Sequence, residues 1–519
     1  MATSLSESAA QRPPGPLAGR RVLVANRGEI ACRILRAVRE EGALGIAVYS
    51  DADRGALHVS LADEAHRIGP APVGASYLDA GALLEACRRS RAELLHPGYG
   101  FFAENADFAE AVERAGIVWI GPPAGVIRTM GDKLAARRAI EGAGVPLVPG
   151  TGALPADPEV AHAHARELGY PVLVKAAFGG GGRGMRRCAD RAGLVASLDL
   201  ARREAERAFG DATIYLEKLI PRPRHIEIQI LADRHGNVIH LGERECSIQR
   251  RHQKLLEESP TPARFPGLRE RMGEAAVAIA RRVGYVNAGT IEFLVDPEGR
   301  FHFLEMNTRL QVEHPVTERV VSFDMVHRQL RIAMGEPLDR RQEVIRWRGH
   351  AIECRINAED PEHGFAPSIG RIAALHLPEG PGVRNDVGIM VGSEVTAHYD
   401  PLLGKLIVWA ENREEAIARA LRALREYRIA GVQTNLPFHR WLLTHPRFAR
   451  GETDTGFLEE EYRPDELARD REEVTAIVGA AWAAYHSAPT QPAPRPAGRL
   501  SAWRQSGRPG PVGGRTGWR

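Results

Sequence analysis

The chain has 519 residues, 44% of them hydrophobic, which is enough for roughly three globular domains. Its formal net charge is only +3, and residues 487–519 carry six arginines and no acidic residue, so the rest of the chain is mildly acidic and no nucleic-acid partner is predicted. The five cysteines are odd in number, widely spaced and without a C-x-x-C pair, which predicts a reducing compartment, no disulfides and no zinc. No apolar stretch approaches 18 residues, so we expect a soluble, cytoplasmic protein without a membrane partner.

Lysine is nearly absent, with five lysines against sixty-four arginines. A site that needs a compact point charge beside a phosphate does not accept the planar guanidinium, so the remaining lysines are candidates for anion binding. Codon bias with a few surviving lysines is the alternative, and only the surroundings of each lysine can decide. The five are Lys133, Lys175, Lys218, Lys254 and Lys405.

The first 130 residues follow a β-α-β pattern. A strand is predicted at 20–25, an amphipathic helix follows in GEIACRILRAVREEG, and a second strand lies at 45–50. Short strands in AELLHP and IVWIG alternate with helices such as the one in ENADFAEAVERAG, which predicts a parallel sheet covered by helices. We expect residues 1–19 to be a flexible N-terminus and residues 20–130 to be a Rossmann-like domain.

A smaller unit, interpreted as a lid, is expected at about 147–220. It holds a helix after LPADPEV, the strand YPVLVKAAF, a run of glycines, the strand GMRRC and a helix at about 190–209. The glycines fit G-x-G-x-x-G, but a dinucleotide site needs a helix directly after them, and here a strand follows. A glycine turn between strands leaves bare N–H groups that can close over phosphate oxygens. A merely flexible hairpin is the alternative; Lys175, four residues before the glycines, favours phosphate.

Antiparallel strands with alternating side chains are predicted from residue 224 onward, up to a helix at 414–429. A further helix is expected within residues 461–486. Residues 487–519 are rich in proline, glycine and arginine, so we expect them to be disordered.

Two carboxylates are predicted to converge in a β-hairpin at residues 290–307. A four-residue turn at 296–299 pairs Val295 with Arg300. Like charges this close need a proton or a cation, and oxygen ligands of this kind suit Mg²⁺ or Mn²⁺ bridging substrate phosphates. A solvated strand face is the alternative, disfavoured by its apolar members. The residues that this register places on one face, with the two glutamates diagonal to each other, are Glu292, Leu294, Phe301, Phe303, Glu305 and Asn307.

The alternation continues past the hairpin. Arg309 and Glu313 are interpreted as an anion clamp and a base beside it, and an edge strand with a polar face is the alternative. The five hydrogen-bonding side chains that one extended segment would present on the same side are Glu305, Asn307, Arg309, Gln311 and Glu313.

Three other features stay ambiguous from the residues alone. His225 alternates with isoleucines in RHIEIQIL, which is more typical of a hydrogen-bonded strand histidine than of a ligand. The basic cluster at 250–254 indicates either a bound anion or a solvated helix. Cys246 has no adjacent base, so a buried structural thiol is favoured over a nucleophile.

The chain resembles biotin carboxylase, the ATP-grasp component of biotin-dependent carboxylases, in nine motifs that cover roughly residues 20–460 in the same order. These are ANRGEIACRI, HPGYGF, MGDK, VKAAFGGGGRGM, RHIEIQIL, SIQRRHQK, LEMNTRLQVEHPVTE, HAIECRINAEDP and YDPLLGKL. The resemblance implies a mixed α/β and α+β fold. Its parts would be the Rossmann-like pre-ATP-grasp domain, an ATP-grasp core and lid at 131–335, and an antiparallel C-terminal biotin carboxylase domain at 336–460.

The resemblance also implies roles for the matching residues. Glu313 would be the general base, Arg355 would steady the biotin enolate, and Arg309 and Lys254 would complete the catalytic set. Leu219 stands where the family often has an aromatic residue, so adenine stacking is expected to be weaker. ATP binding is implied for Lys133, Lys175, Gly180, Gly181, Gly182, Glu217, Lys218, Leu219, His225, Gln249, Glu292 and Glu305. Metal binding is implied for Glu292, Glu305 and Asn307. Bicarbonate or biotin binding is implied for Lys254, Arg309, Gln311, Val312, Glu313 and Arg355.

The implied reaction is ATP-dependent carboxylation of biotin by bicarbonate through carboxyphosphate, with ATP and Mg²⁺ (or Mn²⁺) as cofactors. None of the five lysines lies in a Met-Lys-Met-like turn, so biotin is expected on a separate carrier protein, with carboxyltransferase subunits as further partners. A homodimer is implied by the resemblance. The expected acceptor is acetyl-CoA or another acyl-CoA, as in fatty acid synthesis, and pyruvate, as in a pyruvate carboxylase, is the alternative. Another ATP-grasp ligase and a catalytically silent scaffold protein also stay open.

Overall fold

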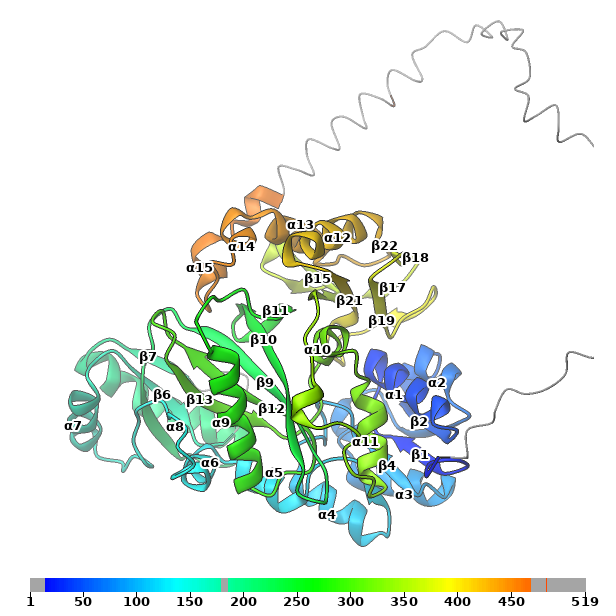
Figure 1. Ribbon diagram of the computed structural model, residues 1–519, viewed down its shortest axis with the longest axis horizontal. Helices are drawn as coiled ribbons and strands as arrows, with labels where there is room; N and C mark the ends of the chain where they lie inside the picture. Colours follow the sequence, from blue (N-terminus) through cyan, green and yellow to red (C-terminus); the bar gives the residue numbers. More distant parts are fainter. Residues whose placement is uncertain (1–14, 179–184, 468–481, 483–519) are drawn as a thin grey trace, which may run out of the picture. The chain divides into compact units, whose positions relative to one another are not determined.

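The computed structural model describes residues 15–178, 185–467 and 482 (Figure 1). The chain divides into two compact units, Met1–Pro464 and Asp465–Arg519, and the helices and strands named below belong to the first. No helix within the described ranges is long and apolar enough to cross a bilayer.

A five-stranded parallel sheet forms the N-terminal part of the first unit, as the β-α-β pattern predicts. Its strand order is β3-β2-β1-β4-β5. Helix α1 turns Ile30, Ile34 and Val38 into the core at helical spacing. The strands are β1 (Arg21–Val24), β2 (Leu44–Ser50), β3 (Glu64–Gly69), β4 (Leu94–His96) and β5 (Val118–Trp119). The helices are α1 (Gly28–Glu40), α2 (Leu57–Leu61), α3 (Ala80–Ser90) and α4 (Ala106–Arg114), with short 3₁₀ turns at Asp51–Asp53 and Val73–Ala75.

A separate three-stranded sheet with its own apolar core lies where the lid is expected. Its strands are β6 (Val172–Ala176), β7 (Arg186–Cys188) and β8 (Ile214–Lys218), in the order β7-β6-β8. The helices that pack on this sheet are α7 (Pro158–Leu168) and α8 (Arg191–Phe209), whereas α5 (Ala124–Gly131) and α6 (Lys133–Ile140) contribute to a different apolar core. The predicted strands and helices around the glycine run are therefore confirmed, whereas Gly180, Gly181 and Gly182 lie outside the described residues.

The centre of the molecule is an antiparallel eight-stranded sheet in the order β13-β12-β9-β10-β11-β14-β21-β19 (Figure 1). It runs without a break through the expected boundary at residues 335 and 336, because β11 pairs with β14. Helix α10 lies against β10, β11, β14 and β21. The strands are β9 (Arg224–Ala232), β10 (Val238–Arg250), β11 (Gln253–Ser259), β12 (Asn287–Val295), β13 (Phe301–Asn307), β14 (His350–Asn357), β19 (Val383–Val387) and β21 (Leu402–Ala410). The helices are α9 (Leu268–Arg282), α10 (His314–Val321) and α11 (Met325–Ala333), with a 3₁₀ turn at Gln342–Val344.

The C-terminal part adds small strand pairs and four helices. The predicted helix at 414–429 is confirmed as α12 but ends at Glu426, because Arg428–Ala430 forms the strand β22. Residues 464–467 are helical, and the rest of the predicted extension, apart from Trp482, is not described. The helices are α12 (Arg413–Glu426), α13 (Leu436–Thr444), α14 (Pro446–Ala449) and α15 (Phe457–Glu461), with a 3₁₀ turn at Pro361–His363. The short strands are β15 (Glu359–Asp360), β16 (Ala366–Pro367), β17 (Gly370–Arg371), β18 (Ala374–His376), β20 (Glu394–Val395) and β22.

The predicted register of the β12–β13 hairpin is wrong. Val295 pairs with Phe301, because the Asp296 side chain accepts hydrogen bonds from two backbone N–H groups and lengthens the turn by one residue. Leu304 is an extra residue in β13, so that Glu292 lies directly opposite Glu305.

Two consequences of this register correct the sequence interpretation. Phe301 and Phe303 do not share the carboxylate face; they lie in the core beside Phe293, on the opposite face of the hairpin. The extended segment also stops early, since β13 ends at Asn307 and the rest of the polar stripe follows an irregular path to α10.

The basic cluster at 250–254 is a β-turn rather than a solvated helix. Arg251 and His252 occupy the two central positions of the β10–β11 hairpin, with φ of 49° and 67°. Two left-handed residues between paired strands are the pattern of a type I′ turn, which usually carries Asn-Gly. Cys246 is buried, in agreement with a structural thiol, and the other four cysteines are buried free thiols as well.

Candidate active site

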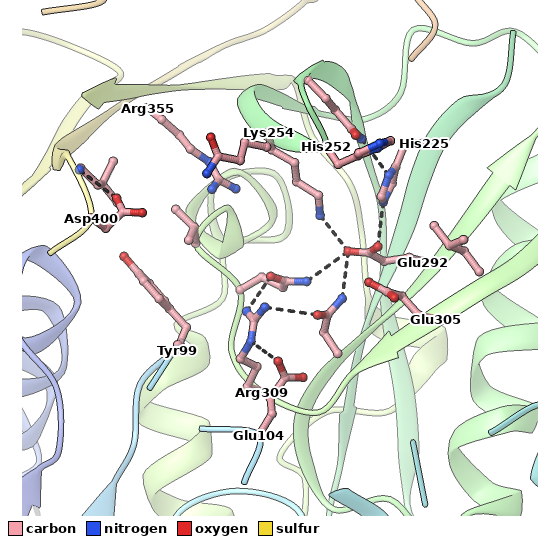
Figure 2. A pocket seen from close by; sticks show the side chains of 18 of the residues that line it. Tyr99, Glu104, His225, His252, Lys254, Glu292, Glu305, Arg309, Arg355 and Asp400 are labelled. Carbon is pink, nitrogen blue, oxygen red and sulfur yellow. Dashed lines mark hydrogen bonds and ion pairs between the residues drawn. The ribbon is translucent and has the colours of Figure 1, made fainter. Parts of the chain in front are cut away.

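A cavity of about 530 Å³ opens between the lid strand β6, the large sheet and the segment after β13 (Figure 2). It is lined by residues from every part of the first unit. Those discussed below are Tyr99, Glu104, Lys133, Lys175, His225, Gln249, His252, Lys254, Glu292, Glu305, Asn307, Arg309, Gln311, Val312, Arg355 and Asp400. Most residues singled out from the sequence are therefore brought to one place.

Lys254 lies inside a cage of three buried carboxylates. Its Nζ is 2.6 Å from Glu227, 2.9 Å from Glu292 and 2.7 Å from Glu313. Burial alone would lower the pKa of Lys254, but the three carboxylates outweigh it and hold the pKa well above its usual value. The ligand-like groups His225–Glu227–Glu292 and Glu227–Cys246–Glu313 surround the same ammonium, which neutralises them as a metal ion would.

Glu313 is the last residue before α10 and is fully buried. Its two oxygens accept hydrogen bonds from Lys254 at 2.7 Å and from Arg355 Nη2 at 2.8 Å. Burial opposes ionisation, but Lys254, Arg355 and Arg244 together hold the pKa of Glu313 well below its usual value. The carboxylate is therefore ionised at neutral pH, but it is not among the residues that line the cavity, and it could accept a proton only after Lys254 or Arg355 releases one of its oxygens.

The hairpin carboxylates form a second acidic pair. Glu292 and Glu305 are opposite each other, and Asn307 Nδ2 donates to Glu292 Oε1 at 2.9 Å. Burial and then the charge of Glu292 raise the pKa of Glu305, so the pair favours a nearby cation. Two carboxylates and an amide oxygen are the hard oxygen donors that Mg²⁺ prefers, so these residues fit a divalent cation.

His225 and Gln249 extend the network around Glu292. The Gln249 amide donates to His225 Nδ1 at 2.8 Å, and His225 Nε2 is 3.1 Å from Glu292. Burial lowers the pKa of His225, but the Glu292 charge outweighs it and the net shift is upward. His225 is thus both a hydrogen-bonded strand histidine and a lining residue of the cavity.

Arg309 joins the irregular segment to the N-terminal domain. Its Nε donates to Glu104 Oε2 at 2.8 Å, its Nη1 to Gln311 at 2.8 Å and its Nη2 to Asn307 at 3.2 Å. Figure 2 shows Arg309 and Glu104 on the opposite side of the cavity from Arg355 and Lys254. Arg309 therefore contacts Asn307 and Gln311, as the polar stripe predicted, although the three residues do not lie on one strand.

Arg355 projects from β14 towards Glu313. Its Nε donates to Glu257 Oε1 at 2.7 Å, and its Nη2 lies between Glu257 and Glu313. A guanidinium held in this way by two carboxylates has a fixed orientation at the cavity wall.

The lysines at the lid side take different positions. Lys133 is the first residue of α6, next to the N-cap Asp132, and its Nζ is 4.0 Å from Glu305. A helix N-terminus favours anions, so this lysine suits a phosphate. Lys175 reaches the cavity from β6 and donates to Glu217 at 2.5 Å. Glu217 therefore lies behind the lysine.

Two predicted adenine-side residues are not brought to the cavity wall. The Lys218 ammonium bonds the carbonyl oxygens of Gly169 and Tyr170, at 2.5 and 3.2 Å. Leu219 is half-buried, and its N–H donates to Pro171 O. Lys218 is the last residue of β8 and Leu219 follows it, and both contact the segment just before β6.

Lys405 is fully buried and contacts the residues behind the cavity wall. Its Nζ donates to Val312 O at 2.7 Å and is 3.2 Å from Glu29, which in turn accepts a hydrogen bond from Tyr99. Lys405 thereby fixes the backbone of the segment between β13 and α10, which is a structural role.

Several residues of the site were not identified from the sequence. Glu227 shares the face of His225 in the alternating strand RHIEIQIL, so the period-two pattern contained a signal for it. Glu104, Glu257 and Asp400 lie in segments whose spacing carries no comparable signal. Tyr99 belongs to the HPGYGF motif, but no role followed from it.

Three family models match the chain: "Biotin carboxylase, N-terminal domain" at residues 18–127, "Carbamoyl-phosphate synthase L chain, ATP binding domain" at 132–341, and "Biotin carboxylase C-terminal domain" at 353–460. The biotin carboxylase of Nostoc sp. is 52% identical over 440 residues, which cover 85% of this chain and 98% of that protein. A pyruvate carboxylase subunit of Methanothermobacter thermautotrophicus is 51% identical over 440 residues, which cover 85% of this chain and 89% of that protein.

A solved structure has the same fold. It is the biotin carboxylase domain dimer of Hydrogenobacter thermophilus 2-oxoglutarate carboxylase, in complex with MgADP, ADP and bicarbonate. The TM-score is 0.83 at 48% identity, covering 86% of this chain and 99% of that one. The mixed α/β fold with a parallel Rossmann-like sheet and a large antiparallel sheet is thus confirmed, and the chain belongs to the biotin carboxylase family.

Proposed function

We propose that this chain uses ATP and bicarbonate to carboxylate biotin on a separate carrier protein. The observation that carries the proposal is the single cavity that unites the lysines and acidic pair of a nucleotide site with Arg309, Gln311, Val312 and Arg355. A ligase for amines or amino acids would need the first group without the second. A silent scaffold would have no reason to keep this many buried charged side chains together.

The nucleotide side of the cavity suits MgATP. Lys133 and Lys175 would neutralise phosphate oxygens, and Glu292, Glu305 and Asn307 would hold the cation. When bound, the cation would neutralise charge that develops on the transferring phosphoryl group. The glutamate pair and the lysines are preorganised for this, because β12, β13 and α6 fix their backbones.

Bicarbonate is a poor electrophile at carbon, and residues on the bicarbonate side of the cavity would activate it for phosphorylation by ATP. Arg309 would hold the bicarbonate anion while Glu313 accepts its proton, so that the freed oxygen attacks the γ-phosphorus of ATP. The products of this step are ADP and carboxyphosphate. Carboxyphosphate then breaks its C–O bond to give CO₂ and phosphate, the phosphate removes the biotin N1 proton, and the resulting nitrogen attacks CO₂. Arg355 would stabilise the negative oxygen of the biotin enolate during this attack.

The partners and the acceptor are also part of the proposal. We infer a biotin carboxyl carrier protein and carboxyltransferase subunits as partners, and a homodimer, for which the biotin carboxylase domain dimer of Hydrogenobacter is a precedent. The proposed acceptor is acetyl-CoA or another acyl-CoA, as in fatty acid synthesis. Pyruvate is the alternative, because one close relative belongs to a pyruvate carboxylase. A cytoplasmic location stays a prediction.

Phosphate release measures the proposed reaction directly. The purified chain should hydrolyse ATP only with bicarbonate and a divalent cation, and free biotin should stimulate the rate. Equal hydrolysis in bicarbonate-depleted buffer would contradict the mechanism, and turnover of an amine substrate instead would favour another ligase.

A further inference from the structure

A second pair of buried glutamates lies behind Arg355, outside the steps described above. Glu257 on β11 and Glu353 on β14 are directly opposite each other in the antiparallel register. Side chains at such positions share one face of the sheet, with Cβ atoms about 5 Å apart. Both residues have no solvent exposure. Two ionised carboxylates in this position would repel each other without relief from water.

The hydrogen bonding of the pair is incomplete if both are ionised. Glu257 Oε1 accepts from Arg355, but Glu257 Oε2 and both oxygens of Glu353 have no hydrogen-bond partner in the described structure. A carboxylate in this position would carry the full desolvation penalty of an unpaired buried charge. A carboxylic acid has one O–H donor, and the unpartnered Glu257 oxygen on the neighbouring strand could accept a hydrogen bond from it.

The positive charges around Glu257 and Glu353 are too few to neutralise both carboxylates, so one of the two is expected to bind a proton. Two arms of Arg355 are already shared between Glu257 and Glu313, and Lys405 is engaged by Val312 and Glu29. The titratable and charged groups that act on the pair are Lys254 on β11, Arg355 and Cys354 on β14, Lys405 on β21, Cys246 on β10 and Glu313 before α10. Of the nearest cations, Arg355 thus bonds Glu257 but not Glu353, and Lys405 is engaged by Val312 O and Glu29.

Electrostatics point the same way as the geometry. Burial is the main cause that raises the pKa of Glu353 well above its usual value, and the partial relief by Lys405 is offset by Glu257. Burial also raises the pKa of Glu257 to about 7, against the attraction of Arg355. Because the charge of Glu257 raises the pKa of Glu353 and Glu257 itself faces the guanidinium, a shared proton is best placed on Glu353.

We propose that Glu353 is a neutral acid at physiological pH, that it donates a hydrogen bond to Glu257, and that together they are positioning residues for Arg355. Glu257 fixes the guanidinium, and the protonated Glu353 fixes Glu257 without adding a third negative charge. This inference rests on the proposed function, in which Arg355 serves the biotin half of the reaction. Loss of the proton at alkaline pH would loosen Arg355 and weaken biotin use before ATP use.

Three variants and one control test the proposal. Glu353→Gln keeps a hydrogen-bond donor but cannot ionise, Glu353→Leu removes the donor, and Glu257→Gln weakens the grip on Arg355. Glu258→Gln is the matched control, because Glu258 is the buried neighbour on β11 that bonds His350 and Arg413 instead. Biotin-stimulated phosphate release is measured from pH 6.5 to 9.5, with KM for biotin and for ATP at each pH.

The expected results separate positioning from folding. Glu353→Leu and Glu257→Gln should raise KM for biotin or lower biotin-dependent kcat by about tenfold, as for a lost hydrogen bond to a charged group, while KM for ATP stays within about twofold. The alkaline decline of wild-type biotin use should be absent from Glu353→Gln. Its melting temperature should also decline less between pH 7 and 9.5 than that of the wild type, a readout that needs no activity.

The opposite results overturn the proposal. Identical alkaline declines in wild type and Glu353→Gln would exclude the shared proton. Equal losses for ATP and biotin in Glu257→Gln, or the same losses in Glu258→Gln, would reduce the pair to a structural element. Failure of the proposed function looks different, because the wild type itself would then show no bicarbonate-dependent hydrolysis.

Discussion

Replacing Lys254 by methionine tests the carboxylate cage most directly. The substitution preserves much of the side-chain volume but leaves Glu227, Glu292 and Glu313 without their shared cation. At about 2.7 Å and an effective dielectric constant near 20, each pair is worth about 6 kcal/mol before the cost of desolvation. Because desolvation cancels most of this, we expect a net loss of about 3–5 kcal/mol, the range for breaking a buried ion pair from one side.

The loss should depend on pH with a defined sign. Without the ammonium, the pKa values of the three carboxyl groups rise in the folded state, so the folded variant binds protons that the unfolded chain releases. Its stability is therefore highest at acidic pH and decreases as the pH rises through the raised pKa values. The destabilisation relative to wild type should be smallest near pH 5 and largest near pH 8.

Thermal and urea unfolding over this pH range provide the measurement, with Lys133→Met as the control, because the Lys133 ammonium lies 4.0 Å from Glu305, a looser ion pair than any of the three at Lys254. The control should lose much less stability. Lys254→Arg should not give wild-type activity, since the larger planar guanidinium would displace carboxylates that now surround a compact ammonium. A Lys254→Met variant that stays within about 1 kcal/mol of wild type at pH 8, or whose stability has the wild-type pH dependence, would refute the reasoning.

Three further predictions concern the chemistry. Glu305→Gln should weaken the affinity for the divalent cation by at least about tenfold. Glu313→Gln should instead lower kcat by about a hundredfold or more, with MgATP affinity nearly intact. Equal loss of nucleotide binding by both variants in equilibrium titrations would show that Glu305 and Glu313 do not differ as metal ligand and base. Arg355→Lys should lower biotin carboxylation by at least about tenfold, because an ammonium cannot reproduce the fork geometry that holds Glu257 and Glu313 and that would stabilise the proposed biotin enolate; near-normal rates would assign the enolate to another residue. The purified chain should carry no covalent biotin after co-expression with a biotin ligase, as intact mass or streptavidin blotting reports, and a biotin adduct would contradict the need for a separate carrier.

The sequence correctly predicts that Glu292 and Glu305 share one face of the β12–β13 hairpin, although the predicted register is wrong. The predicted turn is one residue too short, and Leu304 adds a second shift. Each shift of one residue moves the side chains of β13 to the other face of the hairpin, so two shifts return Glu305 to the face of Glu292, and the two carboxylates lie opposite each other. Phe301 and Phe303 lie between the longer turn and Leu304, where only one shift applies. Their side chains therefore point to the opposite face from the one that the alternating pattern predicts.

The fold is easier to predict than the surroundings of the site. Period-two and helical spacing locate strands such as β9 and helices such as α1, because these patterns follow from burial of one face. The contact of Arg355 with Glu257, or of Lys405 with Val312, depends on which strands become neighbours in the large sheet. Local spacing does not contain that information, since β11 and β14 are separated by about ninety residues of sequence.

The continuity of the large sheet across residues 335 and 336 limits how the chain can be divided. A cut at this position would separate β11 from β14 and leave each fragment with an unpaired row of backbone N–H and C=O groups. The cut would also take Arg355 away from Glu257 and Glu313, which lie on the other fragment. The two sides of this position therefore share one sheet, and we expect fragments cut here to associate with each other or aggregate rather than remain as independent domains.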